Sequence, residues 1–281
     1  MNENYAVRPA ETPDVAAVTA FLATARYIHR HLDWRSTLDW IGHRPFYLLE
    51  ERNRIIALLA YPQDPPGISW IRCFATAPMI SPTKAWNELF SESIKRDESN
   101  RSIICAVGLQ EWFSDLLLAN NFTHFQDIII LLWNRKVPTA QPLPSIFKER
   151  SMHADDIEAV ARLDRKSFEA LWVNSAESIQ LAFQQSDFAE VIEYQGDIVG
   201  YQISTANQFS AHLARLAVHP DFQRHGLGYQ MVNSIILHYR AKGIEQVTVN
   251  TQRNNHSSLT LYKKLGFEIT QEHYPVLVYN R

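Results

Sequence analysis

The sequence repeats itself once, half a chain length further on. Arg8–Val18 reads RPAETPDVAAV and Arg150–Val160 reads RSMHADDIEAV, so arginine, aspartate, alanine and valine recur 142 positions apart. Three more pairs of segments follow in the same order: 46–61 with 188–203, 74–90 with 216–232, and 116–122 with 261–267. Two copies are too few for a solenoid. The chain is therefore expected to form two similar domains.

Each copy reads as a helical region, a hairpin, a strand–turn–helix unit, another strand, a short helix and a final hairpin. Between the copies, KVPTAQPLPSI (136–146) contains three prolines, which disfavour regular structure and mark a linker. We therefore expect a first domain over residues 1–141 and a second over 146–281.

The composition is that of a soluble globular protein, with 46% hydrophobic and 20% charged residues and a net charge of −3. This charge gives no basic footprint for nucleic acid, and no apolar run approaches the roughly 18 residues of a membrane helix. The N-terminal sequence lacks the pattern of a secretory signal. We expect a cytoplasmic protein with neither nucleic acid nor membrane as partner. Cys73 and Cys105 suggest neither a disulfide framework nor a metal site.

A turn with two glycines joins a strand to a helix in the second copy. HLARLAV (212–218) has the composition of a strand, and QRHGLG (223–228) precedes the helix. The apolar face of that helix repeats with a period near 3.6 at Met231, Val232, Ile235, Ile236 and Tyr239. Unpaired N–H groups at a helix N-terminus attract anions such as pyrophosphate, and glycines allow close approach. A plain turn that needs two glycines is the alternative.

Two motifs resemble the signatures of the GCN5-related N-acetyltransferase (GNAT) family. The stretch LAVHPDFQRHGLGYQMV resembles the acyl-CoA signature Q/R-x-x-G-x-G/A, with Gln223, Gly226 and Gly228 at its three positions. NHSSLTLYKKLGF (255–267) resembles the second signature, an asparagine before a short helix ending L-Y-x-K-x-G-F. The resemblance is strong over 147–281 and rests mainly on the repeat elsewhere. It implies an α+β fold of two tandem GNAT-like domains, each a mixed, mostly antiparallel sheet flanked by helices.

The same resemblance implies an acyltransferase whose second half uses acetyl-CoA as cosubstrate, without a metal. The acetyl group would pass directly to a primary amine in a ternary complex. Tyr262 matches the family's general acid, and its ordinary pKa near 10 keeps it protonated. Helix packing is the other role open to Tyr262, and helix capping the other role open to Asn255. The coenzyme-binding residues implied are Leu216, Ala217, Val218, Gln223, Arg224, His225, Gly226, Leu227, Gly228, Asn250, Asn255, Ser258 and Tyr262.

The general base is less evident. Many family members carry a carboxylate at the position of Asn250, and an amide cannot accept a proton from an amine. Glu193 on an earlier strand and His212 beside the fourth strand are the candidates, and His212 has the better ordinary pKa. Each has a purely structural alternative. Phe168 and Trp172, in the segment expected to wall the acceptor site, fit a core as well as a pocket.

The first copy lacks the residues of both signatures. The aligned pairs are Gln223 with Ser81, Arg224 with Pro82, Gly226 with Lys84, Gly228 with Trp86, Tyr262 with Leu117 and Gly266 with Asn121. Pro82 has no N–H to donate, and Trp86 replaces a glycine by bulk. We expect the first half to keep the fold without the coenzyme site.

The sequence leaves three functions open. The leading one is an N-acetyltransferase for a small-molecule or peptide amine, acting as a monomer or homodimer. A non-catalytic acyl-CoA-binding or sensing module is the alternative, because Asn250 would fit a lost base. An aminoacyl transferase that uses charged tRNA is the third, and the intact coenzyme loop and the lack of a basic groove count against it.

Overall fold

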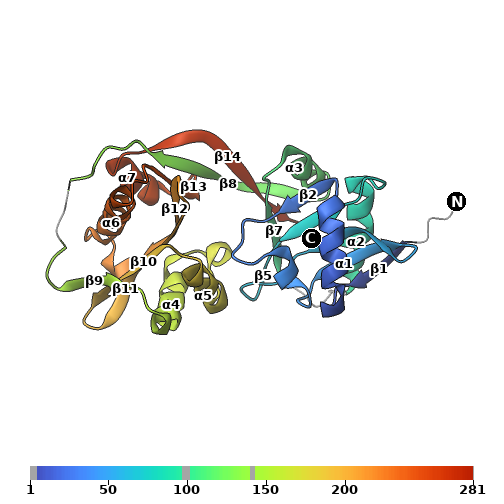
Figure 1. Cartoon of the computed structure of the whole chain (residues 1–281), viewed down its shortest axis with the longest axis horizontal. Helices are drawn as coiled ribbons and strands as arrows, with labels where there is room; N and C mark the ends of the chain where they lie inside the picture. Colours follow the sequence, from blue (N-terminus) through green and yellow to red (C-terminus); the bar gives the residue numbers. More distant parts are fainter. Residues whose placement is uncertain (1–4, 97–101, 140–142, 281) are drawn as a thin grey trace. The chain divides into compact units, whose positions relative to one another are not determined.

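The structure is a computed structural model that describes residues 5–96, 102–139 and 143–280 (Figure 1). It forms two compact units: unit 1 is Met1–Phe125 with Pro275–Arg281, and unit 2 is Gln126–Tyr274. The units thus change at Phe125, not between residues 141 and 146 where the sequence places the boundary. The proline-bearing segment 136–146 holds no helix or strand in its described residues. Nowhere in the described ranges does a helix have the length and apolarity to span a membrane.

Unit 1 contains an antiparallel sheet in the order β1-β3-β4-β6-β2. Its strands are β1 (Tyr5–Pro9), β2 (Tyr27–Arg30), β3 (Phe46–Glu51), β4 (Arg54–Ala60) and β6 (Cys73–Thr76). Beside it β5 (Ile68–Trp70) pairs in parallel with β7 (Ile103–Val107). The helices are α1 (Val15–Thr24), α2 (Pro82–Arg96) and α3 (Glu111–Leu118). The core is rich in aromatic side chains, among them the fully buried Phe74 and Trp86.

Unit 2 repeats this plan with a mixed sheet in the order β8-β13-β12-β11-β10-β9. Its strands are β9 (Phe147–Ser151), β10 (Phe188–Tyr194), β11 (Asp197–Ala206), β12 (Ser210–Val218) and β13 (Gln246–Gln252), with β8 shared as described below. The helices are α4 (Ile157–Ser167), α5 (Ala176–Gln184), α6 (Leu227–Ala241) and α7 (His256–Lys264). Only β12 and β13 pair in parallel. α4 and α5 cover one face of the sheet, and α6 and α7 cover the other (Figure 1).

The repeat seen in the sequence is confirmed by two matching ion-pair clusters. In unit 1, Arg8 contacts Asp14 and Glu50, each at 2.7 Å. In unit 2, Arg150 contacts Asp156 and Glu193, also each at 2.7 Å. In both, the aspartate also accepts from a backbone N–H three residues earlier, at 2.8 Å. Each cluster ties the first strand of its unit to the start of the first helix.

The expected final hairpin of each copy is wrong, because each copy ends in one long strand. These strands are β8 (Phe122–Trp133) and β14 (Phe267–Tyr279). Residues 128–132 of β8 pair with β13 in unit 2, and residues 276–278 of β14 pair with β7 in unit 1. Each strand thus begins in one unit and pairs in the other: β8 begins in unit 1 and pairs with β13 of unit 2, and β14 begins in unit 2 and pairs with β7 of unit 1. This exchange is why unit 1 includes the C-terminal residues.

Candidate functional site

The glycine turn of the second copy has the predicted place between a strand and a helix. β12 ends at Val218, a short 3₁₀ turn spans Pro220–Phe222, and α6 begins at Leu227. Gly226 has φ +85° at the N-cap, a left-handed conformation that suits glycine. The side chain of Gln223 donates to the Val218 carbonyl at 3.2 Å, so it holds the loop against the end of the strand.

The loop presents a row of free backbone donors. The N–H groups of residues 224–229 donate to no acceptor within the described ranges, whereas the N–H of Gln230 bonds the Gly226 carbonyl at 3.0 Å. They lie at the positive end of a fifteen-residue helix. Arg224 adds a cationic side chain to the same loop. An anion would satisfy these donors.

The strand before the loop has an open edge. β12 pairs with β13 only over Ser210–Leu213. β12 continues to Val218 and β13 to Gln252, but beyond Leu213 and Val249 they no longer pair with each other. There β12 pairs only with β11, and β13 pairs only with β8. The facing edge of β12 at residues 214–218 therefore offers backbone groups to an extended ligand, as a sheet edge does in strand addition.

A cavity of about 990 Å³ lies where the loop, the strand and α7 meet. It is lined by Ser167, Phe168, Leu216, Ala217, Val218, Phe222, Gln223, Arg224, His225, Gly226, Leu227, Gly228, Tyr229, Asn255, His256, Ser257, Ser258, Thr260, Leu261 and Lys264. Eleven of the thirteen coenzyme-binding residues named from the sequence are among them; Asn250 and Tyr262 are not. Arg224 and Lys264 give its rim a positive character.

α7 borders the cavity through its N-terminal turn. The Asn255 side chain accepts from the Ser258 N–H at 3.1 Å, so it caps the helix while it lines the cavity. Tyr262 follows Ser258 by one helical turn and lies on the same side of α7. Its ring packs against Phe267 in the core of unit 2, and burial raises the pKa of its hydroxyl well above the ordinary value. Tyr262 therefore stays protonated across the physiological range.

The two base candidates differ in their surroundings. Glu193 is held by Arg150, and the matching cluster occurs in unit 1, which lacks the glycine loop. This argues for a structural role of Glu193. His212 lies on β12 with Nδ1 2.9 Å from Thr248 Oγ1. Asn250 follows Thr248 by two residues on β13, so alternation puts both on the face that α4 covers.

The tautomer of His212 follows from its neighbour. When the Thr248 hydroxyl donates to the Ala211 carbonyl, 3.3 Å away, its oxygen accepts from Nδ1–H of His212 at 2.9 Å. The proton-accepting lone pair is then on Nε2. Burial lowers the pKa of His212 below its ordinary 6.5, so the ring is neutral at pH 7. His212 does not line the cavity; it precedes Leu216 by four residues on the same strand.

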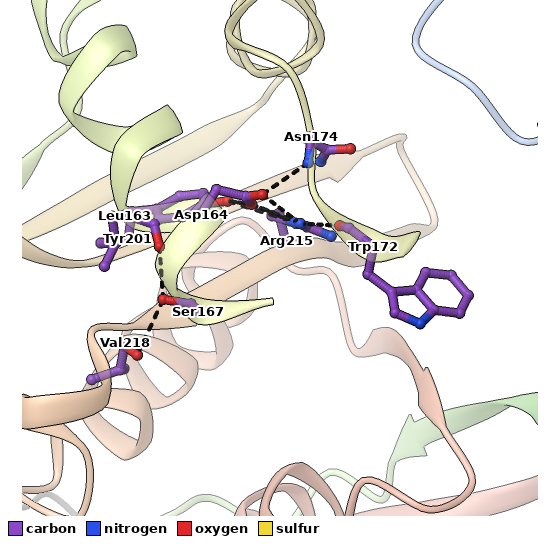
Figure 2. A network of polar contacts seen from close by, with 8 residues as sticks. All are labelled: Leu163, Asp164, Ser167, Trp172, Asn174, Tyr201, Arg215 and Val218. Atoms are coloured by element: carbon purple, nitrogen blue, oxygen red, sulfur yellow. Dashed lines mark hydrogen bonds and ion pairs between the residues drawn. The ribbon is translucent and has the colours of Figure 1, made fainter. Parts of the chain in front are cut away.

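A charged network not predicted from the sequence supports the cavity wall at the end of α4 (Figure 2). Asp164 is fully buried and accepts from Arg215 Nε at 2.7 Å, from Arg215 Nη2 at 2.8 Å and from the Asn174 N–H at 2.9 Å. Tyr201 donates its hydroxyl to the same carboxylate. Arg215 also bonds the Trp172 carbonyl at 2.6 Å. The sequence signal for the ion pair of Asp164 and Arg215 is the single arginine in the apolar strand HLARLAV.

The network reaches the cavity through Phe168 and Ser167. The Arg215 guanidinium lies 3.6 Å from the centre of the Phe168 ring. Ser167 is 2.8 Å from the Leu163 carbonyl and 3.4 Å from the Val218 carbonyl, which links α4 to the end of β12 (Figure 2). Burial alone would lower the pKa of Arg215, but its interactions with Tyr201 and Asp164 raise it overall. Arg215 is thus a permanent charge whose Nε and Nη2 both have acceptors.

The position in unit 1 that corresponds to the cavity of unit 2 is filled by aromatic side chains. Trp86, aligned with Gly228, is buried; it stacks on Phe90 at 4.7 Å and meets Phe74 edge-on at 5.3 Å. Phe74 and Phe113 stand where the repeat puts the cavity-lining Leu216 and Ser258, and Phe113 also packs on Trp86. At the start of α2, Ser81 caps the helix and Pro82 lacks an N–H.

Comparison with known proteins identifies relatives of this chain. Residues 157–267 match the model of the acetyltransferase (GNAT) family. A 128-residue stretch is 23% identical to the [ribosomal protein bS18]-alanine N-acetyltransferase of Escherichia coli strain K12, covering 44% of this chain and 85% of that protein. The fold of the whole chain is shared with two solved structures. A tandem GNAT protein from the clavulanic acid biosynthesis pathway has a TM-score of 0.65 at 12% identity, with 98% of each chain covered. A GCN5-related N-acetyltransferase from Sphaerobacter thermophilus has a TM-score of 0.61 at 13% identity, with 98% and 95% covered.

Proposed function

The chain is a tandem member of the GNAT acetyltransferase family, and from this premise we propose that unit 2 transfers an acetyl group from acetyl-CoA to a primary amine. The observation that carries the proposal is the 990 Å³ cavity, which joins a loop of free backbone donors to the open edge of a strand. Transfer is direct, within a ternary complex. The E. coli relative, named for acetylating an alanine of a ribosomal protein, supports a peptide amine as acceptor.

The residues present fit coenzyme A. The N–H groups of 224–229 and the side chain of Arg224 match a pyrophosphate in charge and hydrogen bonding. The edge of β12 at 214–218 offers donors and acceptors that suit an arm with amide groups. Gly228 keeps the floor of the cavity clear, because a Cβ there would lie 3.2 Å from Leu261 Cδ2. When bound, acetyl-CoA supplies the activated acyl group as a thioester.

The chain must also manage two protons. His212 is neutral at pH 7 with Nε2 as its acceptor, so we assign it the removal of the amine's proton. Tyr262 keeps its hydroxyl protonated, so we assign it the donation of a proton to the departing thiolate. Asn250, on the same face as Thr248, can orient the acceptor by hydrogen bonding. Water is kept from the core side by the apolar packing around Tyr262 and Phe267.

Calorimetric titration of acetyl-CoA is the direct test of this function. We expect one binding site per chain, because unit 1 is filled at the matching place. Turnover should then be found in a screen of peptide and small-molecule amines. Binding without turnover against any amine would favour the alternative of an acyl-CoA-binding module, in which Asn250 marks a lost base. Absence of binding would refute the acyltransferase assignment.

His212→Gln should lower kcat/KM about 100-fold at pH 7, the lower end of the usual contribution of a general base. In the wild type, activity should rise with pH through a midpoint below 6.5, since the neutral ring is the active form and burial lowers the pKa. This rise of activity with pH should be absent in the variant. The matched control is Thr248→Val, which removes only the partner of Nδ1 and should keep the rise. An unchanged pH profile in His212→Gln would show that water or another group is the base.

Tyr262→Phe should lower kcat at least about tenfold, because only the proton donor is lost. The dissociation constant of acetyl-CoA should change less than twofold, since the variant keeps the ring and its packing against Phe267. Steady-state kinetics with calorimetry separates the two quantities. Tyr239→Phe is the control: it removes another buried hydroxyl of unit 2, which bonds Ser204 at 2.9 Å, away from the cavity. If Tyr262→Phe kept the wild-type kcat, Tyr262 would not be the proton donor and its role would be packing alone.

A further inference from the structure

Unit 1 has a cavity of its own, about 450 Å³ in volume, which no step above uses. It lies between α1, the segment that follows β2, the 3₁₀ helix at Thr37–Trp40 and Arg72 just before β6. It is lined by Thr19, Leu22, Ala23, Arg30, His31, Asp33, Arg35, Ser36, Thr37, Leu38, Trp40 and Arg72. This volume is at the lower end of the range for small-molecule sites.

The lining carries more positive than negative charge. Three arginines, Arg30, Arg35 and Arg72, face a single carboxylate, Asp33. Arg72 is only 8% exposed; its Nη1 lies 3.0 Å from Asp33 Oδ2 and its Nη2 donates to the Asp64 carbonyl at 3.2 Å. Its Nε is buried and has no acceptor among the described residues, and His31 Nδ1 is buried without a hydrogen-bond partner there. Unpaired buried polar groups next to a cavity call for a ligand.

An aromatic ring holds two of these cations in place. The guanidinium groups of Arg35 and Arg72 lie 4.4 and 4.9 Å from the centre of the Trp40 ring. Trp40 is buried, and its Nε1 donates to Asp33 at 3.0 Å. Planar guanidinium groups that are held by stacking lose little conformational freedom when a ligand binds. Their paired N–H groups match the two oxygens of a carboxylate.

Unit 2 has a buried arginine with fuller pairing, Arg215, which the repeat aligns with Cys73. There Arg215 uses both Nε and Nη2 on Asp164, and its pKa is raised overall. The repeat puts Leu22 at the position of Asp164, and Leu22 lines the cavity. For Arg72, burial outweighs the attraction of Asp33 and Asp64, so its pKa is lowered. Arg72 thus lacks the full compensation that Arg215 has.

We propose that this cavity of unit 1 binds a small organic acid, whose carboxylate pairs with Arg72 and Arg35 and whose apolar body lies against Leu22, Leu38 and Trp40. The excess of two positive charges favours an anion, and the apolar wall favours a hydrocarbon body over a bare inorganic ion. The site does not depend on the acetyltransferase function of unit 2. It gives the half without a coenzyme site a ligand of its own.

Isovalerate, a branched carboxylate of suitable size, is the probe. Titration at constant ionic strength in a chloride background should show one site per chain with a dissociation constant on the order of 1 mM, as a fragment-sized ligand permits. The neutral isostere isovaleramide should not bind, and inorganic phosphate should not compete. No binding of isovalerate, equal binding of the amide, or equal binding of phosphate would each overturn the assignment.

Variants locate the site. Arg72→Gln and Arg35→Gln should each weaken isovalerate at least about tenfold, the usual scale of a lost charge-assisted pair. Ala23→Phe, at an exposed position on the rim, should block the cavity without touching a charge. The control Arg54→Gln removes an exposed arginine of unit 1 outside the cavity and should change nothing. The circular dichroism spectrum should stay that of the wild type in every variant, which shows that the fold is intact. Unchanged isovalerate affinity in Arg72→Gln and Ala23→Phe would refute the proposed location.

Discussion

Gly228→Trp should abolish detectable acetyl-CoA binding, with a dissociation constant raised at least about 100-fold, or about 2.7 kcal/mol. Position 228 faces Leu261 and Val218 on the floor of the cavity, and even a Cβ lies 3.2 Å from Leu261 Cδ2. An indole must therefore occupy the space beside the free N–H groups of the loop. Unit 1 contains this arrangement, because its aligned Trp86 packs among Phe74, Phe90 and Phe113 where unit 2 is hollow.

The measurement is a calorimetric titration of acetyl-CoA into wild type and variant. Leu237→Trp is the matched control: it puts the same side chain on the same helix, α6, at a residue that is 44% exposed and outside the cavity. It should bind as the wild type does. If Gly228→Trp bound acetyl-CoA with wild-type affinity and one site per chain, the cavity at this loop would not be the coenzyme site.

Local patterns were enough to predict the first hairpin and the strand–turn–helix unit of each copy, but not its final strand. Pro220 and Asp221 end a strand, and the apolar period of α6 is buried, both as expected. The exchange of β8 and β14 could not be predicted this way. Both strands have apolar residues along their length, and the choice of partner depends on pairing between distant segments, which strand composition alone does not specify.

The same limit applies to the site. The cavity-lining loop and Asn255 could be named because their motifs resemble the two GNAT signatures. The role of Glu193 could not, because its partner Arg150 lies 43 positions earlier in the sequence. The buried pair of Asp164 and Arg215 spans 51 positions. The only sequence signal of such a tertiary ion pair is a charged residue within an apolar segment.

Asp164→Ala should lower the free energy of unfolding by about 3–5 kcal/mol, the cost of leaving a buried charge without its partner. Asp164 is fully buried, and the change removes both of its bonds to Arg215, the acceptor of the Asn174 N–H and the acceptor of the Tyr201 hydroxyl (Figure 2). Proteins of this kind have only about 5–15 kcal/mol in total. Urea denaturation followed by circular dichroism measures the loss.

Three further variants separate charge from packing. Asp155→Ala, an exposed aspartate in the 3₁₀ turn just before α4, should stay within about 0.5 kcal/mol of the wild type. Tyr201→Phe should cost about 1 kcal/mol, since it removes one hydrogen bond. The double change Asp164→Leu with Arg215→Met should recover most of the stability, because an apolar pair needs no counter-charge. Its acetyl-CoA affinity is the decisive reading: Arg215 lies over Phe168 on the cavity wall, so a stable protein with weakened binding would show that this network positions the wall as well as stabilising the fold.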